Sequence, residues 1–439
     1  MKHDKRKMNK NKSFIKNDFD FKSLLKPYAN EDEIKLFDSN LNKKPLSSFI
    51  LNKKYLNAQI INEEYDFLIS NNDDELVYQF DNEHKLGKSL LNFAGGFYLM
   101  DISSSLISYY LKDYIKENGL VLDMCSAPGG KSISLAIRRD DLLIVSNDIS
   151  YKRQLETIKN YSRLGLTNIC STSIDPLNFE NGEIYDLVIL DAPCSGSGMI
   201  RKDEDVKNDF SLEKVKRLLP VQSSLLNKAD NLLKKGGYLL YSTCSLSIEE
   251  DELQIKQFLS KHNYKIIDLQ IADKTIISGA NKLGYHLVPG IYKGEGIYFI
   301  LLKKQGDDTS LNYEIKYEDT FENLNLIRYK NNVYAISKLY KSIANYNFIT
   351  PGIKLYNEDE FQKCKYDSYS CKVNYNLNKI DLSKDEAILY ASGSELKTVL
   401  PNDNLVILTY KNIPLGYGKV VDHKIKNYLP KYLKTNLIL

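Results

Sequence analysis

Apolar and polar residues follow two different patterns along the chain. Over residues 19–82 the apolar residues recur mostly at helical spacing, as at Phe21, Leu24 and Tyr28. We expect a small α-rich or mixed module there. From about residue 83 to residue 304, short apolar runs of strand length alternate with helical patterns. This alternation predicts an α/β domain with a mainly parallel sheet and helices on both of its faces.

The α/β region is predicted to hold core strands, intervening helices and an edge hairpin. Strands are expected over 120–124, 142–147, 186–190 and 237–242, helices over 131–139, 151–164 and 211–235, and hairpin strands near 285–288 and 296–302. Gly236 and Gly237 follow the last of these helices, and glycine commonly terminates a helix. We therefore expect this pair to end the helix before the next strand begins.

Changes in composition divide the chain into segments. Residues 1–18 are polar and basic, which predicts a flexible tail. The N-terminal module then occupies 19–82 and the α/β domain 83–304. Residues 305–312 form a polar break and are the expected linker. Residues 313–439 are rich in Tyr and Asn with short strand-like runs, which predicts a separate small α+β or β-barrel-like region.

Composition and charge exclude several classes of protein. Charged residues make up 27% and hydrophobic residues 43% of the 439 residues, which is an ordinary globular balance. The chain shows no apolar run of about 18 residues, so no membrane span is expected, and no apolar stretch follows the basic start as in a secretion signal. Six cysteines without a CxxC pair fit neither a disulfide framework nor a zinc site, and we expect no metal and a reducing cytoplasm. The net charge of +3 does not by itself indicate nucleic acid.

The first predicted strand of the α/β domain runs into a glycine turn and then into a helix. The turn reads Cys125-Ser126-Ala127-Pro128-Gly129-Gly130-Lys131. Glycine lets the backbone approach a ligand closely, and a helix N-terminus offers free N–H groups to an anion such as a carboxylate. The spacing matches neither a phosphate-binding P-loop nor the GxGxxG fingerprint of dinucleotide sites.

Acidic residues follow at the ends of later strands. Asp148 ends the second predicted strand about 20 residues after the glycine turn, where an acid is placed to bind ribose hydroxyls. Asp175 follows another extended stretch, and Asp191 ends the strand predicted over 186–190. Each acid alone is more often a turn former or a helix cap. In this order, however, the turn and the acids predict a pocket for an adenosyl cofactor.

Cysteines occupy two of these strand ends. Cys194 lies in an Asp-Ala-Pro-Cys-Ser-Gly-Ser-Gly loop, and Cys244 lies in a Ser-Thr-Cys-Ser segment. In such surroundings either thiol could act as an activated nucleophile or could only fill space. Cys125 and Cys170 are more typical of small buried side chains. No histidine lies near either motif, which argues against a papain-like hydrolase.

These motifs resemble those of the Nol/Nop/Sun (RsmB/RsmF) family of RNA 5-methylcytosine methyltransferases. The two cysteine segments look like the family's two cysteine motifs, and the glycine turn looks like its cofactor motif. The similarity extends over roughly residues 20–305 and includes the stretches 96–104, 198–203, Gln222, 236–237 and 248–251. The resemblance implies a Rossmann-like class I methyltransferase core, with S-adenosylmethionine as the cofactor.

The resemblance also implies a role for each reactive side chain. Cys244 would be the nucleophile that adds to C6 of the target cytosine, and Cys194 would assist release of the methylated product. Asp191 would hold the N3/amino edge of the base and also lie beside the cofactor. Lys131 would place a positive charge in the pocket. The target base must leave its stack to be reached.

The same family pattern implies the cofactor contacts. The segment 125–131 would wrap the methionine part of S-adenosylmethionine, Asp148 would bind the ribose, and Asp175 would bind the adenine amine. The chain departs from the family in two places. Met100 stands where the family usually has Gln, and the Arg usually found two residues before the Asn of the N-terminal module, here Asn52, is missing. Both departures would affect RNA contacts rather than the thiols.

The C-terminal segment is basic. Residues 411–434 hold six lysines and one acid with tyrosines interleaved, a pattern that fits a solvated surface or phosphate contacts with base stacking. Two stretches, 414–419 and 425–431, resemble the tail of RsmF-like bacterial rRNA enzymes, which implies a PUA-like fold that binds RNA. The residues then expected to contact RNA are Arg201, Lys202, Lys419, Lys426 and Lys431.

The sequence therefore predicts a monomeric cytoplasmic enzyme that methylates cytosine C5 in RNA, with small-subunit rRNA as the expected target. A tRNA target is one alternative. A DNA cytosine-C5 methyltransferase is another, but such enzymes use the cysteine of the Pro-Cys motif and lack a Thr-Cys partner, so Cys244 argues against it. A non-catalytic RNA-binding assembly factor is disfavoured because both thiols and all the acids are present.

Overall fold

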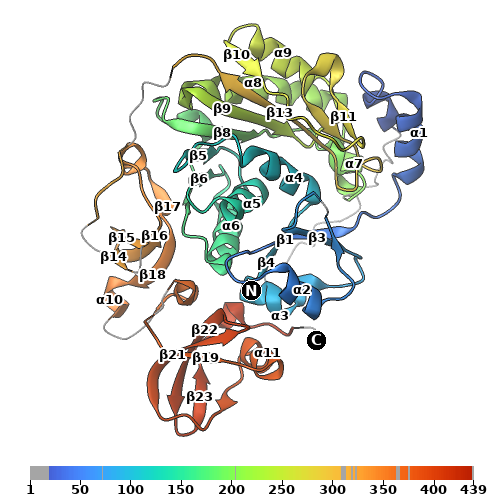
Figure 1. Cartoon of the computed structure of the whole chain (residues 1–439). Coiled ribbons are helices and arrows are strands. Elements are labelled where there is room, and N and C mark those ends of the chain that lie inside the picture. The colour runs from blue at the N-terminus through green and yellow to red at the C-terminus, as the bar shows by residue number, and fades with distance from the viewer. Residues whose placement is uncertain are drawn as a thin grey trace, which may run out of the picture.

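The structure is a computed structural model, and it describes residues 19–71, 73–202, 204–307, 313–317, 320–321, 324–361, 366–373 and 376–437. The predicted tail over 1–18 and the part of the predicted linker over 308–312 lie outside the described residues. Figure 1 shows the central sheet with its helices, the N-terminal module beside it, and the C-terminal parts at the left and at the bottom, where the last of them lies next to the N-terminal module. In the described parts of the chain, no helix is long and apolar enough to cross a membrane.

A ten-stranded sheet forms the centre of the molecule. Its strands are β5 (Leu120–Asp123), β6 (Leu143–Asn147), β7 (Ile169–Thr172), β8 (Tyr185–Asp191), β9 (Leu233–Thr243), β10 (Tyr264–Ile266), β11 (Ile276–Ser278), β12 (Tyr285–Leu287), β13 (Ile297–Lys304) and β17 (Phe348–Thr350). Their order is β11-β12-β13-β9-β8-β5-β6-β7-β17, with β10 paired to β13. The run from β9 to β7 is parallel, and β12 and β13 form the predicted antiparallel hairpin.

Helices cover both faces of this sheet, as Figure 1 shows. On one side lie α4 (Ile102–Leu111), α5 (Gly130–Arg138) and α6 (Tyr151–Leu164), and on the other lie α8 (Leu212–Leu232) and α9 (Glu252–Leu259). The ends of α6 follow from local chemistry. The Ser150 side chain accepts a hydrogen bond from the Arg153 N–H, and Gly165 ends the helix in the left-handed region.

Burial on both faces explains the continuous apolar runs of the central strands. Val121 and Ile189 belong to the core cluster that includes residues of α4 and α5, whereas Leu122 and Val188 belong to the cluster that includes residues of α8. Side chains alternate between the faces of a strand, so a parallel strand between two helical layers has no polar face. Burying each such side chain stabilises the fold by about 1.5–3 kcal/mol.

The predicted helix stop at Gly236-Gly237 was wrong. α8 ends at Leu232 and β9 begins at Leu233, so both glycines lie inside the strand. A Cβ atom on Gly237 would lie 3.0 Å from the backbone oxygen of Asp186. The β8–β9 register is irregular at this point, and the glycines allow the two backbones to approach closely there.

The N-terminal module is mixed rather than mostly helical. It contains η1 (Phe21–Leu24), α1 (Glu31–Asn40) and α2 (Ala58–Glu64), together with β1 (Ser47–Leu51), β2 (Ile69–Ser70) and β3 (Val77–Phe80). These strands form a sheet in the order β2-β3-β1-β4, and β4 (Phe97–Leu99) comes from beyond residue 83. The helical interpretation was wrong over β1 and β3. Both are short apolar runs, which periodicity alone cannot distinguish from buried helix.

The region after residue 313 forms two further sheets. The first contains β14 (Thr320–Phe321), β15 (Leu324–Tyr329), β16 (Asn332–Ile336) and β18 (Ile353–Asn357). The second, in the order β19-β21-β22-β23-β20, contains β19 (Lys379–Asp381), β20 (Leu396–Lys397), β21 (Asp403–Tyr410), β22 (Ile413–Val421) and β23 (Lys424–Asn427), beside α11 (Lys384–Ser392). β17 pairs with β7, so this region also extends the central sheet.

Candidate active site

The carboxyl ends of β5, β6, β8 and β9 lie at one edge of the central sheet, because these strands are parallel neighbours. The glycine turn follows β5, Asp148 follows β6, and Asp191 ends β8. Cys244 follows β9 directly. The structure thus brings together the chemistry-bearing segments predicted from the sequence, at the edge where open α/β sheets bind ligands.

The glycine turn forms a close-fitting backbone cradle. Gly129 is the N-cap of α5 with φ of 101°, and a Cβ atom there would lie 2.8 Å from Thr157 and 2.9 Å from Ile133. Its N–H donates to the Ser126 carbonyl oxygen at 2.7 Å, which fixes the turn. Only glycine fits this position without strain. The first N–H groups of α5 are therefore available to an anionic group.

The acids of the adenosyl side occupy two different environments. Asp148 is buried, and its Oδ1 accepts from the Ser150 N–H at 2.8 Å. Asp175 is exposed and caps the short helix η3 (Pro176–Asn178) by accepting from the Leu177 N–H at 3.0 Å. Two exposed apolar side chains lie near these acids in the sequence. Ile149 directly follows Asp148, and Leu177 comes two residues after Asp175. They are suited to flank a nucleobase, and the sequence interpretation missed them because a single apolar residue in a loop has no periodicity.

The two candidate thiols are direct neighbours. Cys194 Sγ and Cys244 Sγ lie 3.0 Å apart, and the Cys244 N–H donates to Cys194 Sγ at 3.2 Å. Both cysteines are free and partly exposed. The hydrogen bond with Cys244, together with burial and the nearby charges of Glu250 and Asp191, raises the pKa of Cys194 well above its ordinary value. Cys194 is therefore a neutral thiol that can donate to Cys244.

A buried carboxylate joins the loops that carry both thiols. Glu250 Oε1 accepts from the Ser195 N–H at 2.9 Å, and Oε2 accepts from Ser195 Oγ at 2.5 Å and from Ser245 Oγ at 2.7 Å. Gln222 Nε2 donates to Glu250 at 2.9 Å and to the Pro193 oxygen at 3.0 Å. Ser195 and Ser245 are the residues that directly follow the two cysteines. Glu250 therefore sets how the two loops lie against each other.

Asp191 is held by two partners at the end of β8. Lys131 Nζ pairs with Asp191 Oδ2 at 2.8 Å, and Ser242 Oγ donates to Asp191 Oδ1 at 2.7 Å. Behind them, Asp123 Oδ2 accepts from Ser132 at 2.5 Å, and its Oδ1 is buried without a hydrogen-bond partner. Burial raises the pKa of Asp123 to about 7. The sequence interpretation did not single out Asp123, although it ends the first core strand as Asp191 ends another.

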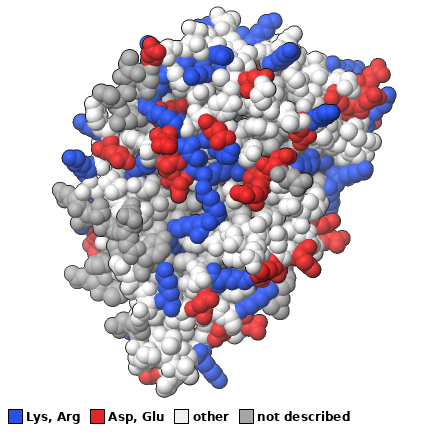
Figure 2. Space-filling model, in the orientation of Figure 1, with Lys and Arg blue, Asp and Glu red and all other residues white. Residues whose placement is uncertain are grey.

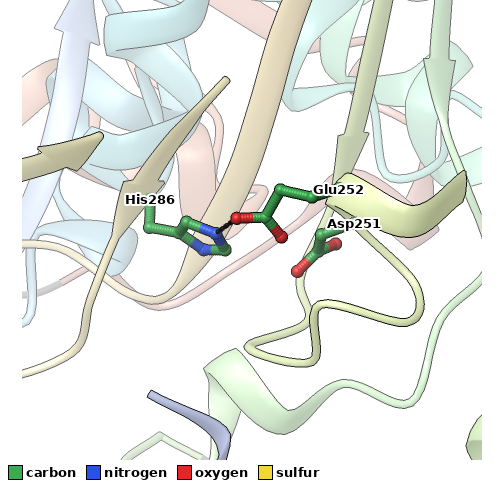
Figure 3. Close-up of side chains that lie close together, drawn as sticks. All are labelled: Asp251, Glu252 and His286. Carbon is green, nitrogen blue, oxygen red and sulfur yellow. Dashed lines mark hydrogen bonds and ion pairs between the residues drawn. The ribbon is translucent and has the colours of Figure 1, made fainter. Parts of the chain in front are cut away.

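A buried cluster of two acids and one histidine lies next to the end of β9. His286 Nε2 contacts Glu252 Oε1 at 2.9 Å beside Asp251, as Figure 3 shows, and all three side chains are buried. Their ligand atoms lie within 4.8 Å of one another, close enough for one cation. The other imidazole nitrogen, however, is buried without a hydrogen-bond partner, whereas a metal-bound histidine ordinarily uses it to fix the ring. Asp251 Oδ1 accepts a hydrogen bond from Thr243 Oγ1 at 2.5 Å, so the cluster fixes the side chain of the residue that precedes Cys244.

The candidate RNA residues fall into two places. Arg201 donates to the Gly294 oxygen at 2.6 Å and lies beside the exposed Lys202, close to the thiol loops. The other three lie on the last sheet and the segment that follows it: Lys419 in β22 faces Lys426 in β23, and Lys431 is exposed beyond β23. Figure 2 shows Lys and Arg side chains mixed with Asp and Glu across the face in view, so the charge of that face alone does not single out an RNA surface.

The two departures from the family pattern lie in the N-terminal module and at its border. Asn52 is buried and donates to the Gly95 oxygen at 3.0 Å and to the Leu164 oxygen at 2.9 Å, so it fastens the module to the end of α6. Met100 is partly exposed at the border with α4. Ile50, which stands at the position of the expected arginine, is fully buried in β1.

Comparison with known proteins places this architecture in a family. A family model described as 16S rRNA methyltransferase RsmB/F matches residues 110–303, and a model described as methyltransferase RsmF PUA domain matches residues 377–434. The chain belongs to the RsmB/RsmF methyltransferase family. The predicted Rossmann-like core and PUA-like module are thereby confirmed, and the PUA match covers the sheet formed by β19–β23.

Relatives of the family cover most of the chain. Ribosomal RNA small subunit methyltransferase F of Aeromonas salmonicida is 28% identical over 393 residues, which is 80% of this chain and 82% of that protein. The protein of the same name from Shewanella piezotolerans is 29% identical over 401 residues, which is 82% of this chain and 84% of that protein. The chain is thus similar to these RsmF proteins across both the catalytic and the C-terminal regions.

Solved structures share the fold. A methyltransferase homologue from Pyrococcus horikoshii has a TM-score of 0.54 and 25% identity, covering 64% of this chain and 93% of that chain. NSun6 from the same organism, solved with SFG, has a TM-score of 0.57 and 17% identity, covering 65% of this chain and 98% of that chain.

RsmB/RsmF enzymes are methyltransferases that use S-adenosylmethionine. Two features of this site fit that cofactor. The glycine turn puts the N-terminus of α5, with its first N–H groups, at the carboxyl end of β5, where it can receive a carboxylate, and the buried Asp123 Oδ1 lacks a partner that an ammonium group would supply. The segment 125–131 with Asp123 would hold the methionine part, and Asp148 and Asp175 the adenosine.

Proposed function

We propose that this RsmB/RsmF enzyme methylates C5 of a cytosine in small-subunit rRNA through a covalent adduct with Cys244. The single observation that carries the proposal is the pair of thiols 3.0 Å apart at the ends of neighbouring strands. A pair of free, partly exposed cysteines next to a cofactor cradle is suited to a reaction that forms and then breaks a thioether, because one thiol can add while the other donates a proton. The names of the related proteins support rRNA as the target.

The chemistry of cytosine requires such a nucleophile. C5 is too weakly nucleophilic to attack a methyl sulfonium, and addition of a thiolate to C6 makes C5 enamine-like. S-adenosylmethionine, when bound, supplies an electrophilic methyl group. The C5 proton then leaves to a base, the C5–C6 double bond reforms, and the C6–S bond breaks to release Cys244 as a thiolate. The thiol of Cys194, which holds its proton, can donate to that thiolate both before addition and at release.

Asp191 is placed to orient the base. Its Oδ1 accepts from Ser242 and its Oδ2 pairs with Lys131, so the carboxylate is fixed from two sides at the end of β8. A carboxylate in that position can accept from the amino group of cytosine and stabilise a proton on N3, and that proton offsets the negative charge that the adding thiolate brings to the ring. Lys131 is almost fully buried, and its ammonium group pairs with the Asp191 carboxylate at 2.8 Å.

The other functions considered differ in which cysteine reacts or in the target. A tRNA cytosine-C5 methyltransferase would use the same site, and only the RNA that carries the product distinguishes it. A DNA cytosine-C5 methyltransferase would use Cys194 as the nucleophile. A non-catalytic assembly factor would not bind S-adenosylmethionine. We further propose that the enzyme acts as a monomer in the cytoplasm.

Sequencing of total RNA that detects 5-methylcytosine tests the proposal directly. A strain lacking this protein is expected to lose the modification at one or more cytosines of small-subunit rRNA, and the intact gene is expected to restore it. The Cys244→Ala gene should not restore it. Loss of 5-methylcytosine from tRNA alone would assign the tRNA activity instead, and an unchanged RNA profile would contradict the proposed function.

A further inference from the structure

A cavity of about 550 Å³, lined by both polar and apolar side chains, opens between the N-terminal module and the catalytic domain. The N-terminal module, whose sheet extends past residue 83 to β4, contributes residues 44–48, Phe80, Asn82 and 84–87, and the catalytic side contributes Asp101, Arg201, Lys202 and Glu295. The volume lies in the range of sites for small organic ligands. We propose that this cavity binds a nucleotide that flanks the target cytosine, with its base on His84 and its phosphates on Lys44, Lys85 and Lys202. The proposal rests on the proposed function.

The cavity is joined to the active site by direct backbone contacts. The Gly198 N–H donates to the Cys244 carbonyl oxygen at 2.8 Å, and the Gly296 N–H donates to the Gly198 oxygen at 2.9 Å. Glu295, which lines the cavity, directly precedes Gly296. The two glycine backbones are so close that a Cβ atom on Gly198 would lie 2.5 Å from the Gly296 oxygen. An occupant of the cavity is therefore a near neighbour of a base held at Cys244.

His84 forms a prearranged surface for a base. Its ring lies 3.6 Å from the Phe67 ring, centroid to centroid, with an angle of 2° between the planes. Phe67 covers one face of the imidazole. His84 is exposed and lines the cavity, whereas Phe67 does not. RNA-binding proteins stack unpaired bases on such aromatic rings, and the ring needs no rearrangement to receive one.

Three lysines line the same cavity as this ring, from both sides of the cavity. Lys44 and Lys85 are exposed on the module, and Lys202 is exposed on the catalytic side. The guanidinium of Arg201 already has partners within the protein, because it donates to the Gly294 oxygen and lies 3.7 Å from a Glu295 carboxylate oxygen. Three exposed lysines and an aromatic ring that can stack, all in one cavity, suit the phosphates and the base of a nucleotide. Met100, where the family usually has Gln, lines the same cavity.

The test uses an in vitro transcript of small-subunit rRNA and the full-length protein. KM for the transcript, kcat at saturating S-adenosylmethionine, and RNA affinity over a range of salt are measured for His84→Ala, His84→Phe and the triple Lys44→Ala, Lys85→Ala, Lys202→Ala variant. Lys88→Ala is the matched control, because Lys88 is exposed on the same module and does not line the cavity. Photocrosslinking from 4-thiouridine placed next to the target cytosine locates the flanking nucleotide.

His84→Ala is expected to weaken RNA affinity and to raise KM on the order of tenfold, and His84→Phe to restore most of the loss because it can still stack. For the triple variant, the slope of log affinity against log salt concentration is expected to correspond to about two fewer phosphate contacts than in wild type. Lys88→Ala should change neither. Crosslinks should fall on the cavity residues.

Equal KM and affinity for wild type and His84→Ala, or crosslinks confined to another surface, would overturn the proposal while leaving the methylation of cytosine intact. If Lys88→Ala lost as much RNA affinity as each lysine of the triple variant loses on average, the effect would come from overall charge, and this result would also overturn the proposal. A wild-type protein that transfers no methyl group to the transcript would contradict the proposed function, and the affinity and crosslinking results would still decide whether the cavity binds RNA.

Discussion

Replacing Glu250 by Gln should slow the reaction without unfolding the protein. Glu250 accepts from Ser195 and Ser245, the residues that follow the two cysteines. A Gln amide has nearly the same shape. Its oxygen can still accept from the Ser195 N–H and from Gln222, while its NH2 group can donate to the two serine hydroxyls, which rotate to accept. The variant therefore keeps its partners but loses the negative charge.

The size of the effect follows from the strength of those bonds. Hydrogen bonds to a charged group contribute about 1.5–3 kcal/mol and neutral ones about 0.5–1.5 kcal/mol, so each serine bond loses about 1 kcal/mol. If the two serine bonds hold the thiols in their reactive arrangement, about 2 kcal/mol is lost from the transition state, which lowers kcat about 30-fold. Glu250→Ala instead leaves buried donors unpaired and should lower the free energy of unfolding by about 3–5 kcal/mol.

The pH dependence separates positioning of the thiols from general stability. After the Cys244 hydrogen bond and burial, the charge of Glu250 also raises the pKa of Cys194. Removing that charge makes the Cys194 thiol easier to deprotonate, so the falling limb of kcat against pH, which follows the loss of that thiol's proton, should move to lower pH in Glu250→Gln. Single-turnover methylation from pH 6 to 10 measures both effects. The exposed neighbour Glu249, which accepts from Ser247, provides the control Glu249→Gln. A Glu250→Gln enzyme with the wild-type kcat and pH profile would refute the reasoning.

Two further predictions concern the cofactor side of the site. Gly129→Ala adds a Cβ atom 2.8 Å from Thr157 at φ of 101°, and it should weaken S-adenosylmethionine binding at least tenfold, as measured by calorimetry. Gly182→Ala, where the added Cβ atom makes only ordinary contacts, is the control and should not weaken binding. Equal affinities of Gly129→Ala and wild type would show that the turn tolerates a side chain. The pKa of Asp123 is about 7 in the fold, above its ordinary value, so the folded state holds a proton that the unfolded chain has lost, and stability falls as pH rises from about 4 through 7. Asp123→Asn should therefore show a smaller fall in urea-measured unfolding free energy between pH 5 and pH 8 than wild type, and parallel slopes would contradict this.

The central domain was predictable because each of its elements obeys a local rule. The helix over Tyr151–Leu164 has the same limits in the sequence and in the structure, since Ser150 and Gly165 cap it. The parallel strands read as continuous apolar runs because both of their faces are buried. Parallel strands then bring their carboxyl ends together, so the grouping of Asp148, Asp191 and the two cysteine loops follows from the order of elements alone.

Features that depend on tertiary contacts were not predictable. β1 and β3 were interpreted as helical, because nearly every residue of these strands is buried and so neither shows an alternating pattern. β17 joins the central sheet across more than 170 residues of chain, beside β7. In the sequence, Glu250 was noted only as part of the stretch 248–251, which resembles the family. Its contacts to the loops of both cysteines come from the way β9 and α9 place it beside β8.

Covalent trapping of RNA by the two cysteine variants tests the central claim most directly. Purified wild-type, Cys194→Ala and Cys244→Ala proteins are incubated with small-subunit rRNA and S-adenosylmethionine and analysed under denaturing conditions. The account predicts that Cys194→Ala accumulates an RNA–protein adduct, because release fails, and that Cys244→Ala forms neither adduct nor 5-methylcytosine. An active Cys244→Ala enzyme beside a Cys194→Ala protein that forms no adduct and no product would contradict it.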